Sequence, residues 1–333
     1  MMNKKNILIL GGGGYVGCNL VRKLLMQNHN VIVYDLFLYK EDVFSDLKNN
    51  KNLTSIKADI RDLGKLESVL ENVNIIIHLA CISNDPSYEL NPKLGEDINF
   101  TCFPKLINKI NKFNVEQFIY ASSSSVYGIK EESSVTEDLK AEPITDYSKF
   151  KLECENILLN NQGSFLKTII RPATVCGYSE RQRLDVIVNI LTNHAFFNKK
   201  IIIHGGEQLR PNIHIDDMSD SYIHVMKNSE ASNNEIFNVG DENHSVNKLA
   251  EMVNQSCPDA KLIREKVLDQ RSYKISSEKI YKKIGFQTKK TIKNAIDDLV
   301  KAFSEKKLIN TFENDEFYNI KIINKKLKSL LNG

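Results

Sequence analysis

The chain has 333 residues, of which 41% are hydrophobic and 26% are charged, which is the composition of an ordinary globular protein with room for one or two domains. Its 45 basic and 42 acidic residues leave a formal net charge of +3, too small an excess to indicate nucleic acid or a membrane surface as a partner. The apolar runs are shorter than the roughly 20 residues of a membrane span, and the first residues lack the pattern of a signal peptide, so we expect a soluble cytoplasmic protein.

Apolar runs and helical patterns alternate through the first half of the chain. Six runs rich in Ile, Val and Leu are predicted to be strands: residues 6–10, 31–35, 53–59, 73–80, 115–123 and 165–173. Apolar residues recur at helical spacing between them, near residues 20–25, 63–73, 97–113 and 147–160. Strands that are apolar throughout are buried on both faces, as in a parallel sheet. We therefore predict a doubly wound α/β domain of the Rossmann type, with ligands at the carboxyl ends of its strands.

The pattern becomes irregular in the second half of the chain. Further strands and helices are predicted within residues 199–206, 210–226, 234–240 and 246–255. We expect a smaller substrate-binding lobe over residues 176–333, interleaved with an NAD-binding domain over residues 1–175 because some segments return to the first domain. The stretch from about residue 306 is rich in Lys and Asn, with Ile and Leu at helical spacing, and is interpreted as a peripheral helix without an assigned function.

Four consecutive glycines follow the first predicted strand. Gly11, Gly14 and Gly17 have the spacing GxxGxxG, in which the first permits a tight turn, the second lets backbone approach a diphosphate and the third lets the helix pack on the strand. Amide groups at the helix N-terminus then face the phosphates. Asp35 ends the second strand, about 20 residues further on, where a carboxylate binds ribose hydroxyls and repels a 2′-phosphate. The predicted cofactor is therefore NAD.

A second motif, "YSKFK", places Tyr147 and Lys151 four residues apart, on one face of a predicted helix. A phenol with a pKa near 10 is not a base at neutral pH, but a neighbouring ammonium and a positive nicotinamide ring favour the phenolate. Tyr147 is therefore predicted to take the hydroxyl proton of an alcohol while hydride leaves for the nicotinamide. The stretch "ASSSSVYG" follows a predicted strand and offers hydroxyls that can hold the reacting oxygen.

Together these motifs resemble the extended short-chain dehydrogenase/reductase family of nucleotide-sugar epimerases and dehydratases, from Gly11 to about Leu299. The resemblance implies that Ser123, counted back from "VYG", acts with Tyr147 and Lys151 in catalysis. It also implies a set of NAD-binding residues: Gly11, Gly14, Tyr15, Val16, Gly17, Asp35, Asp59, Ile60, Leu79, Ala80, Asn99, Tyr147 and Lys151.

The later motifs resemble the nucleotide-sugar half of that family's site. Arg210, in "RPNIHIDD", and Arg271, in "DQRSYKIS", are expected to contact the diphosphate of a nucleoside-diphosphate sugar, because guanidinium groups pair with phosphate oxygens. The other expected substrate contacts are Ser83, Asn84, Ser124, Thr174, Arg181 and Arg183. The resemblance further implies a homodimer. The histidines and the six cysteines lack metal-ligand or disulfide spacing, so we expect reduced thiols and no metal.

Departures from the family pattern narrow the chemistry. Family dehydratases have an acidic residue after the catalytic hydroxyl residue, whereas this chain has Ser124 and Ser125, which disfavours dehydration. Thr174 replaces an Asn of many epimerases, which leaves the sugar open. We expect NAD-dependent oxidation at the 4-position of a nucleoside-diphosphate sugar. The enzymes of surface-polysaccharide synthesis, among them 4-dehydrogenases of GDP-linked heptose, are those that this chain most resembles in the segments "SNDPSYELNP" and "RPATVCGYSERQRLD". A 4-epimerase is the alternative. A non-catalytic NAD-binding regulator is less favoured, because such proteins usually lose the Tyr–Lys pair.

Overall fold

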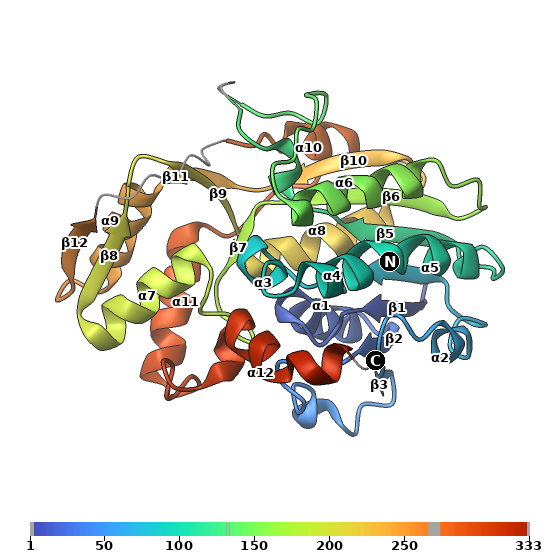
Figure 1. Cartoon of the computed structure of the whole chain (residues 1–333), viewed down its shortest axis with the longest axis horizontal. Coiled ribbons are helices and arrows are strands. Elements are labelled where there is room, and N and C mark those ends of the chain that lie inside the picture. Colours follow the sequence, from blue (N-terminus) through green and yellow to red (C-terminus); the bar gives the residue numbers. More distant parts are fainter. Residues whose placement is uncertain (1–2, 131, 133, 266–273, 332–333) are drawn as a thin grey trace.

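The computed structural model describes residues 3–130, 132, 134–265 and 274–331, and its centre is a seven-stranded sheet in which every neighbouring pair is parallel (Figure 1). In spatial order the strands are β10 (Glu235–Val239), β6 (Leu166–Pro172), β5 (Gln117–Ala121), β4 (Ile75–His78), β1 (Asn6–Leu10), β2 (Asn30–Asp35) and β3 (Leu53–Lys57). The strand order runs in opposite directions on the two sides of β1, so a crevice forms at the carboxyl ends of β1 and β4. The predicted Rossmann-type fold is confirmed.

Alternate residues of the central strands point into two separate cores, one on each face of the sheet. In β1, Ile7 and Ile9 belong to one cluster and Leu8 and Leu10 to the other. The first cluster is covered by α1 (Tyr15–Met26) and α8 (Ile215–Lys227), and the second by α5 (Phe103–Ile110) and α6 (Asp146–Leu159). Because both faces are covered, the strands can be apolar along their whole length.

Two predicted helices are shorter or less regular than the sequence pattern indicated. The segment 97–113 is divided into the π-helical turn η2 (Asp97–Thr101), which follows α4 (Pro92–Glu96), and α5, whose second residue is Pro104. Proline lacks the N–H that would continue the helical ladder, which explains the break. The helix expected over 63–73 extends only over α2 (Leu63–Glu67), after which turns place the remaining apolar side chains in the core.

The second half of the chain builds smaller layers beside the main sheet. Three strands form one small sheet, and two form another: β7 (Thr174–Cys176), β9 (Leu209–His214) and β11 (Glu242–Ser245), then β8 (Lys200–His204) and β12 (Lys261–Glu265). Their apolar sides pack with α7 (Ile187–Asn198), α9 (Val246–Ser256) and α11 (Ile292–Ser304). The chain returns to the main sheet with α8 and β10. The predicted boundary after residue 175 falls inside β7, and the division into two domains stays a prediction.

The remaining short elements lie on loops between these layers: η1 (Ser45–Leu47), α3 (Asp85–Tyr88), η3 (Ser124–Tyr127), α10 (Glu278–Ile284) and η4 (Asp315–Phe317). The last helix, α12 (Asn319–Leu331), returns to the first half of the chain (Figure 1). Its Ile323 and Leu330 join the cluster that contains Tyr34 and Ile60. Within the described residues no helix has both the length and the apolar character of a membrane span.

Candidate active site

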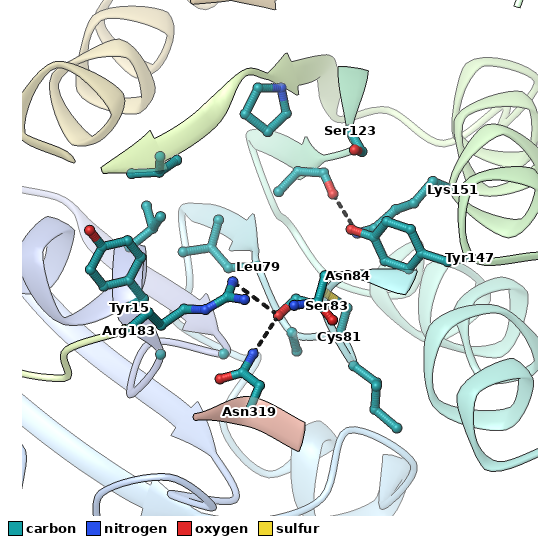
Figure 2. A pocket seen from close by; sticks show the side chains of 18 of the residues that line it. Tyr15, Leu79, Cys81, Ser83, Asn84, Ser123, Tyr147, Lys151, Arg183 and Asn319 are labelled. Atoms are coloured by element: carbon teal, nitrogen blue, oxygen red, sulfur yellow. Dashed lines mark hydrogen bonds between the residues drawn. The ribbon is translucent and has the colours of Figure 1, made fainter. Parts of the chain in front are cut away.

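A cavity of about 590 Å³ lies at the carboxyl ends of the central strands, where the topology predicts a ligand. The glycine turn, the ends of β2, β4 and β5, and residues of α6 and α12 all contribute to its wall. Figure 2 shows how side chains from these distant parts of the chain converge. The predicted site residues that line the cavity are Gly11, Gly14, Tyr15, Val16, Gly17, Asp35, Asp59, Ile60, Leu79, Ala80, Ser83, Asn84, Ser123, Ser124, Tyr147, Lys151, Thr174, Arg181, Arg183 and Arg210.

The glycine turn has the close packing that the sequence predicted. Gly11 has φ +82°, and a Cβ there would lie 2.5 Å from the backbone nitrogen of Ala80, so only glycine fits this position. Gly14 is the N-cap residue of α1 and supplies no side chain to cap it, which leaves amide groups of the first turn directed at the cavity. These features fit the diphosphate of a dinucleotide.

Asp35 is held firmly at the end of β2. Its Oδ2 accepts a hydrogen bond from the N–H of Gly13 at 2.9 Å, and its Oδ1 accepts one from the N–H of Phe37 at 2.6 Å. Burial raises the pKa of Asp35, although these two N–H groups and the charge of Arg181 oppose the shift. The side chain therefore lies beside the glycine turn, where a ribose would be bound.

Two predicted cofactor residues make contacts that the sequence did not reveal. The carboxylate of Asp59 forms a bidentate ion pair with Arg61, with distances of 3.0 Å from Nε and 2.8 Å from Nη2. Asn99 is buried and does not line the cavity, because its amide exchanges hydrogen bonds with the backbone N–H and C=O of Ile82. The structure therefore places Asn99 behind the cavity wall, where it supports the loop that follows β4.

The predicted catalytic residues come together on one side of the cavity (Figure 2). A capping box formed by Thr145 and Ser148 begins α6, so that Tyr147 and Lys151 lie in its first two turns. The Nζ of Lys151 is 6.0 Å from the centroid of the Tyr147 ring and donates a hydrogen bond of 2.7 Å to the carbonyl of Ala121. Ser123 is the N-cap of η3 and accepts a hydrogen bond from the N–H of Ser125 at 3.1 Å.

Burial dominates the electrostatic surroundings of Tyr147. Burial raises the pKa of Tyr147 well above its ordinary value, and the charges of Cys81 and Asp85 raise it further. Arg183 and a hydrogen bond with Ser123 oppose this shift. Burial therefore outweighs the neighbouring charges at Tyr147, and the joint effect of Lys151 and a nicotinamide ring on the pKa of this phenol stays a prediction.

A buried ion pair that the sequence reasoning missed lies beneath the serine loop. Glu155, on α6, accepts hydrogen bonds from Arg171 at 3.0 and 2.6 Å, and both side chains are buried. Ser122 donates to the same carboxylate, and the Arg171 guanidinium lies 4.8 Å from the centroid of the Tyr127 ring. This network ties β5, β6 and α6 together and thereby orients the loop that carries Ser123.

The opposite wall contains Arg183 and, from near the end of the chain, Asn319 (Figure 2). Arg183 pairs with Asp185 at 2.8 Å and donates to the hydroxyl of Ser83 at 3.5 Å. Asn319, the first residue of α12, donates to the same hydroxyl at 2.9 Å. The helix predicted near the end of the chain is present as α12, and its Asn319 and Leu330 both line the cavity, although the sequence left its function unassigned. No local sequence motif pointed to Asn319.

Three further results concern the remaining predicted residues. Asn84 caps α3 by accepting a hydrogen bond from the N–H of Ser87 at 3.0 Å. Arg210, on β9, donates to the carbonyl of Leu209 at 3.0 Å. Arg271 lies outside the described residues. Within the described parts of the chain there is no group of His, Cys, Asp and Glu side chains that could hold a metal ion.

Comparisons with known proteins agree with this geometry. The model of the NAD dependent epimerase/dehydratase family matches residues 7–240. A UDP-glucose 4-epimerase of Lactobacillus helveticus is 26% identical over 254 residues, which is 70% of this chain and 76% of that protein. Two solved structures share the fold. The UDP-glucuronic acid 4-epimerase of Bacillus cereus, with UDP-glucuronic acid and NAD, has a TM-score of 0.80 at 22% identity. The match covers 90% of this chain and 99% of the Bacillus cereus chain. The dTDP-glucose 4,6-dehydratase of Streptomyces venezuelae, with NAD bound, has a TM-score of 0.82 at 20% identity. The match covers 90% of this chain and 97% of the Streptomyces venezuelae chain.

Proposed function

Because this chain belongs to the NAD dependent epimerase/dehydratase family, we propose that it oxidises the 4-position of a nucleoside-diphosphate sugar in the cavity described above. The chain is an NAD-dependent enzyme of the nucleotide-sugar epimerase and dehydratase type. The observation that supports the proposal best is the convergence of Ser123, Tyr147 and Lys151 in the cavity that also contains the glycine turn.

The proposed cofactor contacts follow from the residues of the cavity wall that fit the parts of NAD. The turn of Gly11, Gly14 and Gly17 would hold the diphosphate of NAD, and Asp35 would bind the ribose hydroxyls. When bound, NAD supplies a nicotinamide ring that accepts hydride from an alcohol carbon. Leu79 and Ala80 would contact the cofactor, because both line the cavity and Ala80 lies directly beside Gly11 of the glycine turn.

Tyr147 would move the proton of the sugar hydroxyl. Its phenolate accepts that proton when the C–O–H group becomes a ketone, and Ser123 holds the same oxygen through its hydroxyl. The ammonium of Lys151, 6.0 Å from the ring, favours the charged form at that moment. Burial raises the pKa of Tyr147 and so favours the phenol, which donates its proton to the oxygen when a ketone is reduced, whereas Lys151 and the positive nicotinamide ring favour the phenolate needed for the oxidation. Both directions of the reaction therefore suit this residue.

Two outcomes of the oxidation are proposed for the intermediate ketone. The relatives named UDP-glucose 4-epimerase favour its reduction on the other face, which inverts the 4-position. The two sequence segments quoted above support release of the ketone from a GDP-linked heptose, as in a 4-dehydrogenase. Dehydration is disfavoured by the serines at 124 and 125, which cannot act as the acid or base that eliminates water. We also propose that the enzyme works in the cytoplasm as a homodimer in the synthesis of surface-polysaccharide sugars.

The experiment combines a substrate panel with one substitution and a matched control. The full chain is incubated with NAD and with GDP-, UDP-, CDP- and dTDP-linked sugars, and products are separated by chromatography and mass spectrometry. We expect a product of unchanged mass with altered retention for a 4-epimerase, or one lacking two hydrogens, with NADH formed, for a 4-dehydrogenase.

Tyr147→Phe should reduce turnover by about 10²–10⁴-fold, the usual value of a general acid–base group, and should leave NAD affinity unchanged. Tyr281→Phe, on exposed α10, is the control and should keep wild-type turnover. Wild-type turnover in Tyr147→Phe, or loss of water from the sugar, would contradict the proposal. A regulator would convert none of these sugars.

A further inference from the structure

Arg181 is a buried positive charge on the cavity wall. Its side chain is only 2% exposed, and its guanidinium lies 4.0 Å from the centroid of the Tyr39 ring. Among the described residues it forms no ion pair with a carboxylate, and its Nε is buried without a hydrogen-bond partner. Burial lowers the pKa of Arg181 to about 10. The charges of Asp185 and Asp35 act on this guanidinium without forming an ion pair with it. A buried guanidinium that no carboxylate contacts is costly, so a bound anion is expected to supply the missing contact.

The position of Arg181 distinguishes it from Arg183, although the two residues are close in sequence. The N–H of Arg181 donates to the sulfur of Cys18, on α1, at 3.4 Å, and its charge is one of those that act on Asp35. The charge of Arg183 acts on Tyr147, at the catalytic end of the cavity, as well as on Tyr15 and Tyr39. Arg181 therefore faces the end of the cavity that contains the glycine turn, where the diphosphate of a dinucleotide would lie.

Asn319 holds Arg181 from the other end of the chain. The side-chain oxygen of Asn319 accepts a hydrogen bond from the guanidinium, and its side-chain nitrogen donates to Ser83 at 2.9 Å. Its backbone N–H donates to Asp185 at 2.9 Å. Asn319 is itself buried, so these contacts are shielded from water.

The helix that begins at Asn319 is fastened along the same side of the cavity. Lys326 donates to the carbonyl of Leu38 at 2.8 Å, and Arg61 donates to the carbonyl of Leu330 at 2.8 Å. We propose that Arg181 binds the diphosphate of the dinucleotide and that Asn319 is the positioning residue that holds the guanidinium there. The inference rests on the dinucleotide site of the proposed function, but it requires no particular sugar and its test requires no turnover.

The test measures binding of three probes to the purified full chain by isothermal titration calorimetry. NAD and ADP contain a diphosphate, whereas adenosine contains the same base and ribose without phosphate. The variants are Arg181→Met, Asn319→Ala and the double variant, with Asn324→Ala, an exposed position on the same helix, as control. Asn319→Asp is added because its carboxylate would neutralise Arg181 and keep α12 attached if Asn319→Ala does not fold.

We expect Arg181→Met to weaken the binding of NAD and ADP about 10–100-fold, which is the usual effect of losing a hydrogen bond to a charged group. The affinity for adenosine should change less than about twofold. Asn319→Ala and Asn319→Asp should weaken the binding of the same two probes. The double variant should lose little more affinity than Arg181→Met alone, because Asn319 acts through Arg181. Equal losses for adenosine and ADP would indicate a merely structural role and would overturn the proposal. Unchanged affinities for NAD and ADP would also overturn it, while the proposed reaction would stand.

Discussion

Gly17 offers a quantitative test of the dinucleotide site. It lies in the first turn of α1, and a Cβ at this position would lie 2.6 Å from the carbonyl oxygen of Gly11 and 2.7 Å from the Cα of Gly12. Ordinary contact begins at 3.4 Å, so the substitution Gly17→Ala forces the helix and the turn apart by up to 0.8 Å. The opposing atoms are backbone, and no side-chain rotation can relieve the overlap.

Two opposing effects determine the stability of Gly17→Ala. Alanine in a helix is favoured over glycine by about 1 kcal/mol, whereas overpacking costs about 1–3 kcal/mol. We therefore expect the free energy of unfolding to fall by about 0–2 kcal/mol. The effect on the cofactor is larger, because displacement of α1 removes an amide hydrogen bond to a charged phosphate, worth about 1.5–3 kcal/mol. The dissociation constant of NAD should rise by about 10–100-fold.

Gly64→Ala is the matched control for Gly17→Ala. Gly64 also lies in a helix, α2, and the nearest atom to its Cβ would be a side-chain oxygen of Asp62 at 3.6 Å. This variant should keep the NAD affinity of the wild type and gain up to about 1 kcal/mol of stability. Calorimetric titration with NAD and unfolding in urea measure the two quantities. If folded Gly17→Ala bound NAD as tightly as Gly64→Ala, the assignment of the turn to the diphosphate would be refuted.

Three further outcomes are expected. Burial lowers the pKa of His78 to about 3, below its unfolded value near 6.5, so the free energy of unfolding should fall by up to about 1.4 kcal/mol per pH unit as the pH falls from 6.5 towards 3. His78→Leu should reduce the slope of the unfolding free energy against pH by that amount. An unchanged slope would disprove this role of His78. Glu155→Gln should lower the free energy of unfolding, measured in urea, by about 3–5 kcal/mol, because it leaves the Arg171 charge buried without its partner. Adding Arg171→Met should recover part of that loss. A Glu155→Gln variant as stable as the wild type would contradict the ion pair. Asp35→Ser should lower the ratio of NAD to NADP affinity, measured by titration, since the like charge that repels a 2′-phosphate is gone, and a constant ratio would argue against a ribose contact.

The sequence by itself determined the parts of the protein that depend on neighbouring residues. The glycine turn between a strand and a helix, Asp35 at the end of the next strand, and Tyr147 and Lys151 one helical turn apart are all set by local spacing. The apolar strands likewise predicted the parallel sheet, because burial on both faces removes any alternation from their pattern.

Only the tertiary structure decided which distant side chains share the cavity. Asn319 meets Ser83 and Arg181 across more than a hundred residues of chain, and Glu155 pairs with Arg171 from a different element. Such contacts depend on how helices and strands pack, which leaves no periodic signal in the sequence. The surroundings of Tyr147 depend on packing for the same reason: the neighbouring lysine is visible in the sequence, but the burial that raises the pKa of Tyr147 comes from the assembled fold.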